Sequence, residues 1–327
     1  MRRVKALLLP VKRLFHPWCE DVIRAIGDRH DLSVFDDTRP LAPQFEGVEV
    51  VIDHGGSVGS RAMMDAAHDA RLWQILGTGF DHFDLAYIRQ KNIPVANCPG
   101  QFSSIALAET AMMFILMLAR RYRDAAANFQ AGVFYQPLGR ELHGLNLGII
   151  GFGASGQALG RRAKASGLHI LAIDVRPIEP EILEEIRPDF LGGPAEMEWV
   201  IAESDFLSLH LHLNATTRHI IDARRLALMK PTACLINVAR GALVDETALY
   251  DALTTGRLGG AGLDVFAKEP VDPAAPVFQL PNVVVTPHIA GVTDGTSRRR
   301  AACAAQNVDR VAQGLEPLYR IDQEGGR

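Results

Sequence analysis

Short apolar segments alternate with helical patterns over the first hundred residues of the chain. Each apolar segment is only a few residues long and rich in Val, Ile and Leu, which is typical of buried strands in a parallel sheet. This alternation predicts a small α/β domain. The predicted strands are residues 5–9, 32–35, 48–52, 73–76 and 94–96, and the predicted helices are residues 18–28, 61–70 and 85–91.

The same alternation returns after residue 144 and predicts a second, larger sheet. A buried helix over residues 105–119 and an irregular stretch over residues 132–144 separate the two patterns. Six parallel strands of a doubly wound sheet are expected, with helices between them. The predicted strands are residues 145–150, 169–173, 206–210, 233–237, 262–265 and 283–285, and the helices include residues 222–228 and 246–254.

The final helical segment, residues 297–313, adds nothing obvious to the second sheet. We therefore expect it to return to the first domain, which makes two connections between the domains. The expected fold is α/β, with two Rossmann-like or flavodoxin-like domains built on parallel sheets. Residues 1–100 and 291–327 are expected to form a discontinuous domain, and residues 101–290 a domain inserted into it.

Composition is that of a globular protein large enough for two domains. The chain has 327 residues, and a single hydrophobic core rarely grows that large. The net charge of −4 gives no general affinity for nucleic acid or for an anionic membrane. No apolar segment reaches the roughly 20 residues that a bilayer-spanning helix needs. The four cysteines are scattered without a C-x-x-C pair, so we expect reduced thiols in a cytoplasmic protein.

One glycine-rich turn joins a predicted strand to a predicted helix. Gly151, Gly153 and Gly156 form G-x-G-x-x-G there. The first glycine allows a tight turn, the second lets backbone N–H groups approach a diphosphate, and the third lets helix and strand pack closely. Asp174 ends the next strand, where a carboxylate can hold a ribose hydroxyl. This order predicts a dinucleotide-binding domain. Asp174 favours NAD, and Arg176 leaves NADP as the less favoured alternative.

Two loops of the first domain, residues 53–57 and 77–81, are rich in glycine and follow predicted strands. Ligands bind beyond the carboxyl ends of the strands in an open parallel sheet. Bare glycine amides at that edge can hold a substrate carboxylate. The alternative is that the glycines only close turns, and neither loop alone decides between the two. On the first interpretation, the discontinuous domain binds the substrate.

Three polar residues stand in loops after apolar strands of the second domain, namely Arg240, Glu269 and His288. An arginine can pair with a substrate carboxylate and polarise its carbonyl group. A histidine can exchange a hydroxyl proton, and a glutamate can hold its imidazole. Together they suit hydride transfer. Taken singly, each also fits a structural role, as a surface cation, a loop histidine or a turn residue.

These segments resemble the motifs of the D-isomer-specific 2-hydroxyacid dehydrogenases. Residues 151–156 are similar to the cofactor loop of that family. The resemblance extends from about Gly77 to Pro317, and its motifs occur in the order and at the spacing of the family. The further matching segments are residues 228–246, 262–266 with 269–270, 280–283 and 286–291.

The resemblance implies a role for each matched residue. Arg240, Glu269 and His288 match the catalytic triad, with His288 as the acid/base and Arg240 also contacting the substrate. It further implies a homodimer formed through the cofactor domain, which the helix at 105–119 and the stretch 132–144 would suit. The implied substrate-binding residues are Gly77, Thr78 and Gly79. The implied cofactor-binding residues are Gly151, Gly153, Ala154, Ser155, Gly156, Asp174, His210, Ala239, Asp264 and Gly291.

Departures from the family pattern leave the substrate open. Residues 53–57 lack the arginine that is common in this loop, which weakens a phosphoglycerate interpretation. Arg61 can compensate or be a helix cation, and contact of His54 with the substrate is undecided. His210 and His212 suit one side of a strand, but no third ligand is evident, so no metal is predicted.

Several functions of the same fold stay open at this point. Glyoxylate, hydroxypyruvate, 3-phosphohydroxypyruvate and longer 2-ketoacids all remain possible substrates, in either direction of reaction. An NAD-sensing, dimeric corepressor-like scaffold is the alternative from another class. A formate dehydrogenase is a third possibility, although its substrate does not need a glutamate-paired histidine.

Overall fold

The chain is described from a computed structural model that covers residues 2–11, 15–54 and 59–323. It divides into two compact units, which are described separately. Unit 1 contains Met1–Ser103 and Val292–Arg327, and unit 2 contains Ser104–Gly291. Among the described residues, no helix is long and apolar enough to cross a membrane.

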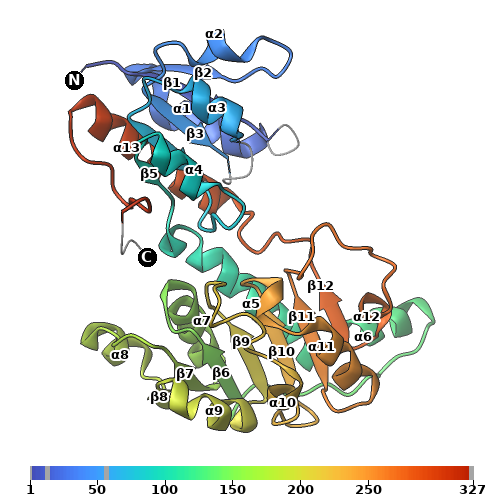
Figure 1. Cartoon of the computed structure of the whole chain (residues 1–327). Helices are drawn as coiled ribbons and strands as arrows, with labels where there is room; N and C mark the ends of the chain where they lie inside the picture. Colours follow the sequence, from blue (N-terminus) through green and yellow to red (C-terminus); the bar gives the residue numbers. More distant parts are fainter. Residues whose placement is uncertain (1, 12–14, 55–58, 324–327) are drawn as a thin grey trace. The chain divides into compact units, whose positions relative to one another are not determined.

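Unit 1 is built on a parallel sheet of five strands in the order β2-β1-β3-β4-β5 (Figure 1). The strands have Leu, Val and Ile on both faces, and each strand lies within two residues of its predicted position. They are β1 (Lys5–Leu9), β2 (Asp31–Val34), β3 (Val50–Asp53), β4 (Leu72–Ile75) and β5 (Val95–Ala96).

Helices cover both faces of this sheet, because alternate strand residues point to opposite sides. Leu8 and Ile52 pack toward α1 and α13, whereas Leu7 and Val51 pack toward α2, α3 and α4. The one-turn helix α2 was not predicted, because five residues are too few to show a helical period. The helices are α1 (Glu20–Ile26), α2 (Leu41–Phe45), α3 (Arg61–Ala66), α4 (Leu85–Gln90) and α13 (Asp294–Ala312), with short turns η2 (Phe15–Cys19), η3 (Gly27–Arg29) and η4 (Gly100–Phe102).

Unit 2 contains a parallel sheet of seven strands in the order β12-β11-β10-β9-β6-β7-β8 (Figure 1). Six strands were predicted, and β8 was missed because it is a half-buried edge strand of three residues. The strands are β6 (Asn146–Ile150), β7 (His169–Ile173), β8 (Phe190–Gly192), β9 (Phe206–Leu209), β10 (Cys234–Asn237), β11 (Gly260–Leu263) and β12 (Val283–Val285).

Two hydrophobic cores flank the sheet of unit 2. Ile149 and Ile170 face α5 and α7, whereas Ile150 and Leu171 face α9 and the elements near α11. The predicted helix at 105–119 is α5, and α6 was not predicted. The helices are α5 (Ser104–Ala119), α6 (Tyr122–Gln130), α7 (Ala154–Ala165), α8 (Pro180–Ile186), α9 (Met197–Glu203), α10 (Ala223–Leu226), α11 (Glu246–Thr254) and α12 (Pro276–Gln279), with turns η5 (Pro194–Glu196) and η6 (Gly241–Leu243).

Candidate active site

An imidazole and a carboxylate form a hydrogen-bonded pair in unit 2. His288 follows β12, and its Nδ1 lies 2.7 Å from Glu269 Oε2. The other Glu269 oxygen accepts a hydrogen bond from the backbone N–H of Phe266 at 3.0 Å, which fixes the carboxylate. The His288 side chain is 48% exposed, so the ring is accessible. Because Nδ1 faces a carboxylate, we assign the proton to that nitrogen, and Nε2 is left for chemistry.

Asp264, directly after β11, holds the loop that carries His288. The carboxylate is fully buried, and its Oδ1 accepts hydrogen bonds from Thr286 Oγ1 at 2.6 Å and Ile289 N–H at 2.8 Å. Its Oδ2 accepts one from Ala290 N–H at 2.8 Å. His288 has a φ of +55°, a left-handed conformation that costs about 1 kcal/mol in a residue other than glycine. The three hydrogen bonds hold the loop in this conformation. The cofactor contact expected of Asp264 stays a prediction.

Arg240 lies in a turn directly after β10. Asn237 Nδ2 donates to the Arg240 carbonyl at 2.9 Å, and Asn237 Oδ1 accepts from the Ala239 N–H at 3.1 Å. The guanidinium Nη1 donates to the Ala239 carbonyl at 2.7 Å. The side chain of one buried asparagine therefore fixes the backbone that presents the guanidinium.

Gly241 packs this turn against the loop after β11. A Cβ atom at Gly241 would lie 1.8 Å from the carbonyl carbon of Phe266, so only glycine permits the contact. Strands β10, β11 and β12 are parallel neighbours, and their carboxyl ends therefore lie at one edge of the sheet. The three predicted catalytic residues all follow these strand ends.

The glycine turn lies at the end of β6 and opens α7. Gly151 has a φ of +96°, and a Cβ there would lie 2.5 Å from the His210 carbonyl oxygen. A Cβ at Gly156 would lie 2.2 Å from the Gly151 carbonyl oxygen, so the close packing of helix and turn requires glycine. At Gly153 a Cβ would meet only the flexible Arg176 guanidinium, at 3.1 Å. The turn is therefore open on the side where the first N–H groups of α7 have no partner within the helix.

Asp174 directly follows β7 and lies beside this turn. Its Oδ2 accepts a hydrogen bond from the Phe152 N–H at 2.8 Å. Its Oδ1 accepts one from the Arg176 N–H at 3.0 Å and pairs with Arg176 Nε at 3.3 Å. Arg176 is the residue that kept NADP as an alternative, and its guanidinium pairs with the Asp174 carboxylate, which offsets its positive charge. An open glycine turn, a helix N-terminus and an acid at the end of β7 together fit a dinucleotide.

His210 lies between two serine hydroxyls. Its Nδ1 is 3.0 Å from Ser155 Oγ, and its Nε2 is 2.9 Å from Ser208 Oγ. Burial lowers the pKa of His210 to about 4, so the ring is neutral at physiological pH. Both ring nitrogens are engaged, whereas His212 is exposed. Within the described residues, no three His, Cys, Asp or Glu side chains gather as a metal site.

In unit 1, residues 77–79 form a tight turn after β4. The Gly77 carbonyl accepts a hydrogen bond from the Cys98 N–H at 3.2 Å, and the Thr78 carbonyl accepts one from Asn97 Nδ2 at 2.8 Å. Among the described residues, no acceptor receives a hydrogen bond from the N–H groups of Gly77, Thr78 or Gly79. Three consecutive N–H donors of this kind form an anion-binding arrangement.

The two other residues considered for substrate contact differ in their surroundings. Arg61 lies on the surface, where it pairs with Asp84 at 2.6 Å and lies over the Tyr87 ring, as a helix cation does. His54 is buried after β3, edge-on to Trp18 at 5.5 Å between ring centroids. The predicted substrate loop continues into residues 55–57, which lie outside the described part of the chain.

Several side chains that hold the site together were missed by the sequence analysis. Thr286 binds Asp264, Ser208 binds His210, and Asn97 fixes the turn at 77–79. Thr286 carried a weak signal, since it precedes His288 by two residues. Ser208 and Asn97 gave no signal in the sequence, because their hydrogen-bond partners are known only from the folded structure.

Comparison with known proteins shows the family of the chain. Residues 112–290 match the family model for the NAD-binding domain of D-isomer-specific 2-hydroxyacid dehydrogenases. A glyoxylate reductase of Thermococcus litoralis is 38% identical over 273 residues, which are 81% of this chain and 80% of that protein. A D-3-phosphoglycerate dehydrogenase of Methanocaldococcus jannaschii is 33% identical over 91% of this chain, but the match covers only 56% of that longer protein.

A solved structure shares the fold over nearly the whole chain. The D-lactate dehydrogenase of Aquifex aeolicus, complexed with NAD and lactic acid, superposes with a TM-score of 0.79 at 27% identity, covering 98% of this chain and 99% of that one. The chain therefore belongs to the family of D-isomer-specific 2-hydroxyacid dehydrogenases and is an oxidoreductase that interconverts 2-hydroxyacids and 2-ketoacids with a nicotinamide dinucleotide.

Proposed function

We propose that this enzyme uses His288, Glu269 and Arg240 as its catalytic residues and reduces glyoxylate or hydroxypyruvate with NADH. The observation that carries the proposal is the 2.7 Å hydrogen bond between His288 Nδ1 and Glu269 Oε2 at an accessible sheet edge. A carboxylate-paired imidazole suits the exchange of a proton with a hydroxyl group that is forming or being oxidised.

Unit 2 is the proposed cofactor-binding domain. The diphosphate is expected at the open turn and at the N-terminus of α7, and the adenosine ribose at Asp174. Asp174 favours NAD because its carboxylate would repel a 2′-phosphate. When bound, the cofactor supplies the hydride for reduction or accepts it in oxidation. The residues proposed to hold it are Gly151, Gly153, Ala154, Ser155, Gly156, Asp174, His210, Ala239, Asp264 and Gly291.

His288 moves the proton in the proposed mechanism. In reduction, its protonated ring donates from Nε2 to the oxygen of the substrate carbonyl as that oxygen gains negative charge. In oxidation, the neutral ring takes the hydroxyl proton. Glu269 keeps the imidazole in one orientation and stabilises its charged form.

The substrate carboxylate has two proposed receptors. One is the guanidinium of Arg240, which would also polarise the reacting carbonyl. The other is the row of N–H groups at Gly77, Thr78 and Gly79 in unit 1, the proposed substrate-binding domain. The bare amides support this assignment because no described acceptor competes for them.

A small substrate is favoured over a phosphorylated one. Residues 53–57 contain no arginine, and Arg61 is already paired with Asp84. The relatives named as glyoxylate reductases and glyoxylate/hydroxypyruvate reductases support the same choice.

The proposed reaction is tested by NADH oxidation over a panel of 2-ketoacids. We expect rapid loss of NADH absorbance with glyoxylate or hydroxypyruvate, less with 3-phosphohydroxypyruvate, and slower reaction with NADPH. Absence of turnover with every 2-ketoacid would remove the proposed substrates. Faster reaction with NADPH would reverse the cofactor preference.

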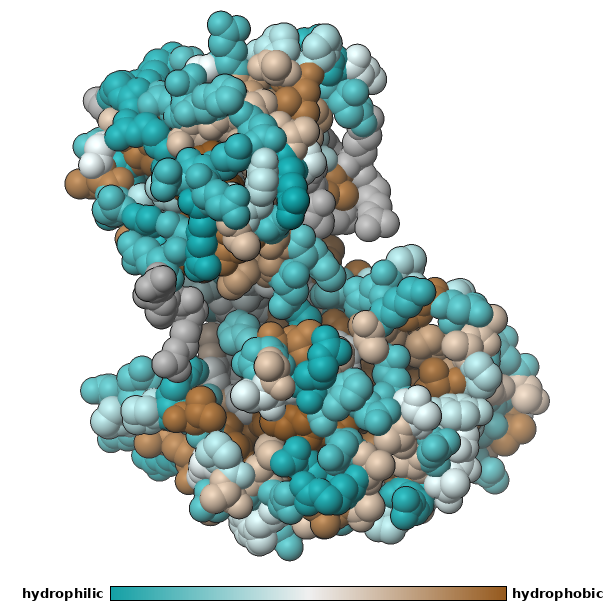
Figure 2. Space-filling view, in the orientation of Figure 1, coloured by the Kyte–Doolittle hydropathy of each residue, from teal (hydrophilic) through white to brown (hydrophobic). Residues whose placement is uncertain are grey.

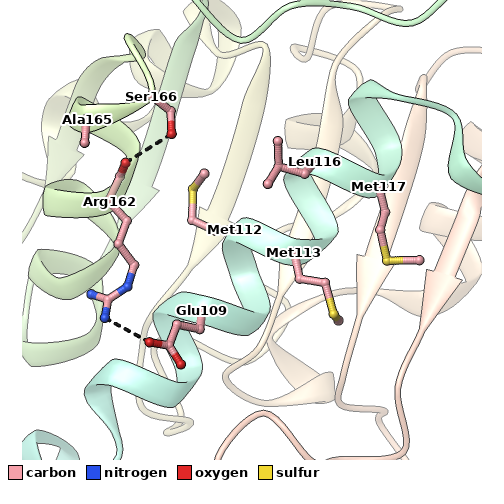
Figure 3. A pocket seen from close by; sticks show the side chains of 8 residues that line it. All are labelled: Glu109, Met112, Met113, Leu116, Met117, Arg162, Ala165 and Ser166. Atoms are coloured by element: carbon pink, nitrogen blue, oxygen red, sulfur yellow. Dashed lines mark hydrogen bonds and ion pairs between the residues drawn. The ribbon is translucent and has the colours of Figure 1, made fainter.

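We further propose a cytoplasmic homodimer formed through unit 2. A hollow of about 590 Å³ is lined by methionine and leucine side chains of α5 and by residues of α7, and Arg162 of α7 pairs with Glu109 of α5 at 3.1 Å (Figure 3). Leu116 is 46% exposed, and Phe134 and Leu138 in the following segment are 66% and 90% exposed. Figure 2 shows apolar patches on the visible face of unit 2. Apolar surface of this extent is typical of an interface.

The dimer is tested by light scattering after gel filtration. Wild type is expected at twice the chain mass, and Leu116→Glu at the mass of one chain, because a buried unpaired carboxylate opposes association. Glu181→Gln on the exposed face of α8 is the control. A monomeric wild type would contradict the proposal.

A further inference from the structure

Helix α13 brings a guanidinium to the turn at 77–79 within unit 1. Arg300 Nη2 lies 3.3 Å from Thr78 Oγ1 and donates to it. The same hydroxyl lies 3.4 Å from Ser103 Oγ. The contact joins residues that are 222 positions apart in the sequence, and α13 packs beside β4 in the core of the unit.

The Arg300 guanidinium lies over the buried Trp18 ring. Its Cζ lies 5.6 Å from the centroid of the Trp18 ring, a cation–π geometry. The His54 ring meets the same indole edge-on. Burial, together with the positive charge of Arg300, lowers the pKa of His54 to about 4. At physiological pH His54 is thus neutral, and Arg300 brings the positive charge to this group of side chains.

We propose that Arg300 is a substrate-binding residue, which pairs with the same 2-ketoacid carboxylate that the N–H groups of Gly77, Thr78 and Gly79 receive. The inference rests on the proposed function, since it takes that turn as the carboxylate receptor. Backbone N–H donors alone bind an anion through partial charges, whereas a guanidinium adds a full charge and a planar pair of donors that match a carboxylate. Thr78 links the two sets of donors, because its N–H belongs to the turn and its hydroxyl oxygen accepts a hydrogen bond from Arg300.

The positive charge of the Arg300 guanidinium beside Thr78 favours a carboxylate over a neutral group at this turn. The contacts of its guanidinium include the Thr78 hydroxyl and the Trp18 indole. A carboxylate from the substrate would bring the opposite charge to the guanidinium. The assignment also gives unit 1 a charged contact of its own with the substrate, on the domain that lacks the common loop arginine.

The test measures binding of oxamate, a 2-ketoacid analogue that cannot be reduced, to the full-length enzyme with saturating NADH. Arg300→Met keeps the length of the side chain and removes its charge. It is expected to weaken oxamate binding about 10- to 100-fold, the usual effect of losing a charge-assisted hydrogen bond. The KM for the 2-ketoacid should rise by a similar factor, with a smaller change in kcat and unchanged NADH affinity.

Two further variants separate substrate binding from a structural role. Arg300→Lys, which restores a cation, should recover part of the oxamate affinity. Arg298→Met removes an exposed arginine that pairs with Asp294 on the same helix, and it should behave as wild type. If Arg300→Met is poorly folded, Arg300→Gln, which keeps a donor for Thr78, is measured in its place with the same expectation.

Two failures are distinguishable. An active wild type whose oxamate affinity is unchanged in folded Arg300→Met or Arg300→Gln overturns the Arg300 assignment alone. A loss of affinity that Arg300→Lys does not recover at all also overturns it, because a carboxylate would still respond to the lysine charge. A wild type that oxidises NADH with no 2-ketoacid overturns the proposed function itself.

Discussion

Glu269 fixes which nitrogen of His288 is available for proton transfer. Its carboxylate lies 2.7 Å from Nδ1 and holds the ring in one orientation. We expect Glu269→Gln to lower kcat about 10- to 100-fold, and His288→Asn by about 100-fold or more. NADH affinity, measured by fluorescence titration, should stay within about twofold of wild type in both. Wild-type turnover in His288→Asn would exclude the acid/base role.

We expect the choice between NADH and NADPH to depend on Asp174, whose carboxylate pairs with Arg176. Asp174→Ser removes the charge that repels a 2′-phosphate and releases Arg176 to bind one. We expect the preference for NADH over NADPH, measured as the ratio of kcat/KM values, to fall about tenfold or more. Stability should fall by about 1 kcal/mol, because the Phe152 N–H loses its acceptor. Glu185→Gln, at a surface pair with Arg161, is the control. An unchanged ratio would show that residues other than Asp174 determine the preference for NADH over NADPH.

At the scale of elements, the contact between the loops after β10 and β11 depends on Gly241. A methyl group there would lie 1.8 Å from the Phe266 backbone, so the two loops must separate in Gly241→Ala. We expect a loss of about 2 kcal/mol or more in unfolding free energy, together with a lower kcat, because both loops carry side chains that we propose to be catalytic. Gly100→Ala is the control, since nothing lies within 4 Å of its added Cβ. If the two variants had the same unfolding free energy in urea and the same kcat, the contact between these loops would contribute neither to stability nor to turnover.

The strands that are buried on both faces follow most directly from the sequence. Strands such as β1 and β3 are continuous apolar segments, and their ends follow directly from the pattern. Element α6 has no buried residue, and β8 is a half-buried edge, so neither leaves a hydrophobic signal. The loops that carry the proposed catalytic residues could be selected because they follow predicted strands and carry family motifs. The contact between Thr78 and Arg300 could not be predicted, because local sequence patterns do not indicate which residues 222 positions apart are in contact.

At the scale of the whole molecule, one neutral buried histidine in each unit couples stability to pH. The pKa values of His54 and His210 are lowered to about 4, against about 6.5 in an unfolded chain. Between these values the unfolded chain binds more protons, so stability is full above pH 6.5 and is lost as pH falls toward 4. At pH 5 each histidine would cost about 2 kcal/mol relative to pH 7.5. Carboxylates such as Asp189, with a pKa of about 2, lose their contribution only at lower pH.

The loss of folding stability between pH 7.5 and pH 5 should therefore be traceable to protonation of His54 and His210. We expect the thermal midpoint of wild type to fall over this interval at fixed protein concentration. His210→Gln cannot take up a proton and should show a smaller fall, even if its midpoint at pH 7.5 is lower. His68→Gln removes an exposed histidine and should follow the wild-type slope. An equal slope in His210→Gln and wild type would mean that the ring between Ser155 and Ser208 is protonated without cost, so that its burial does not govern its charge.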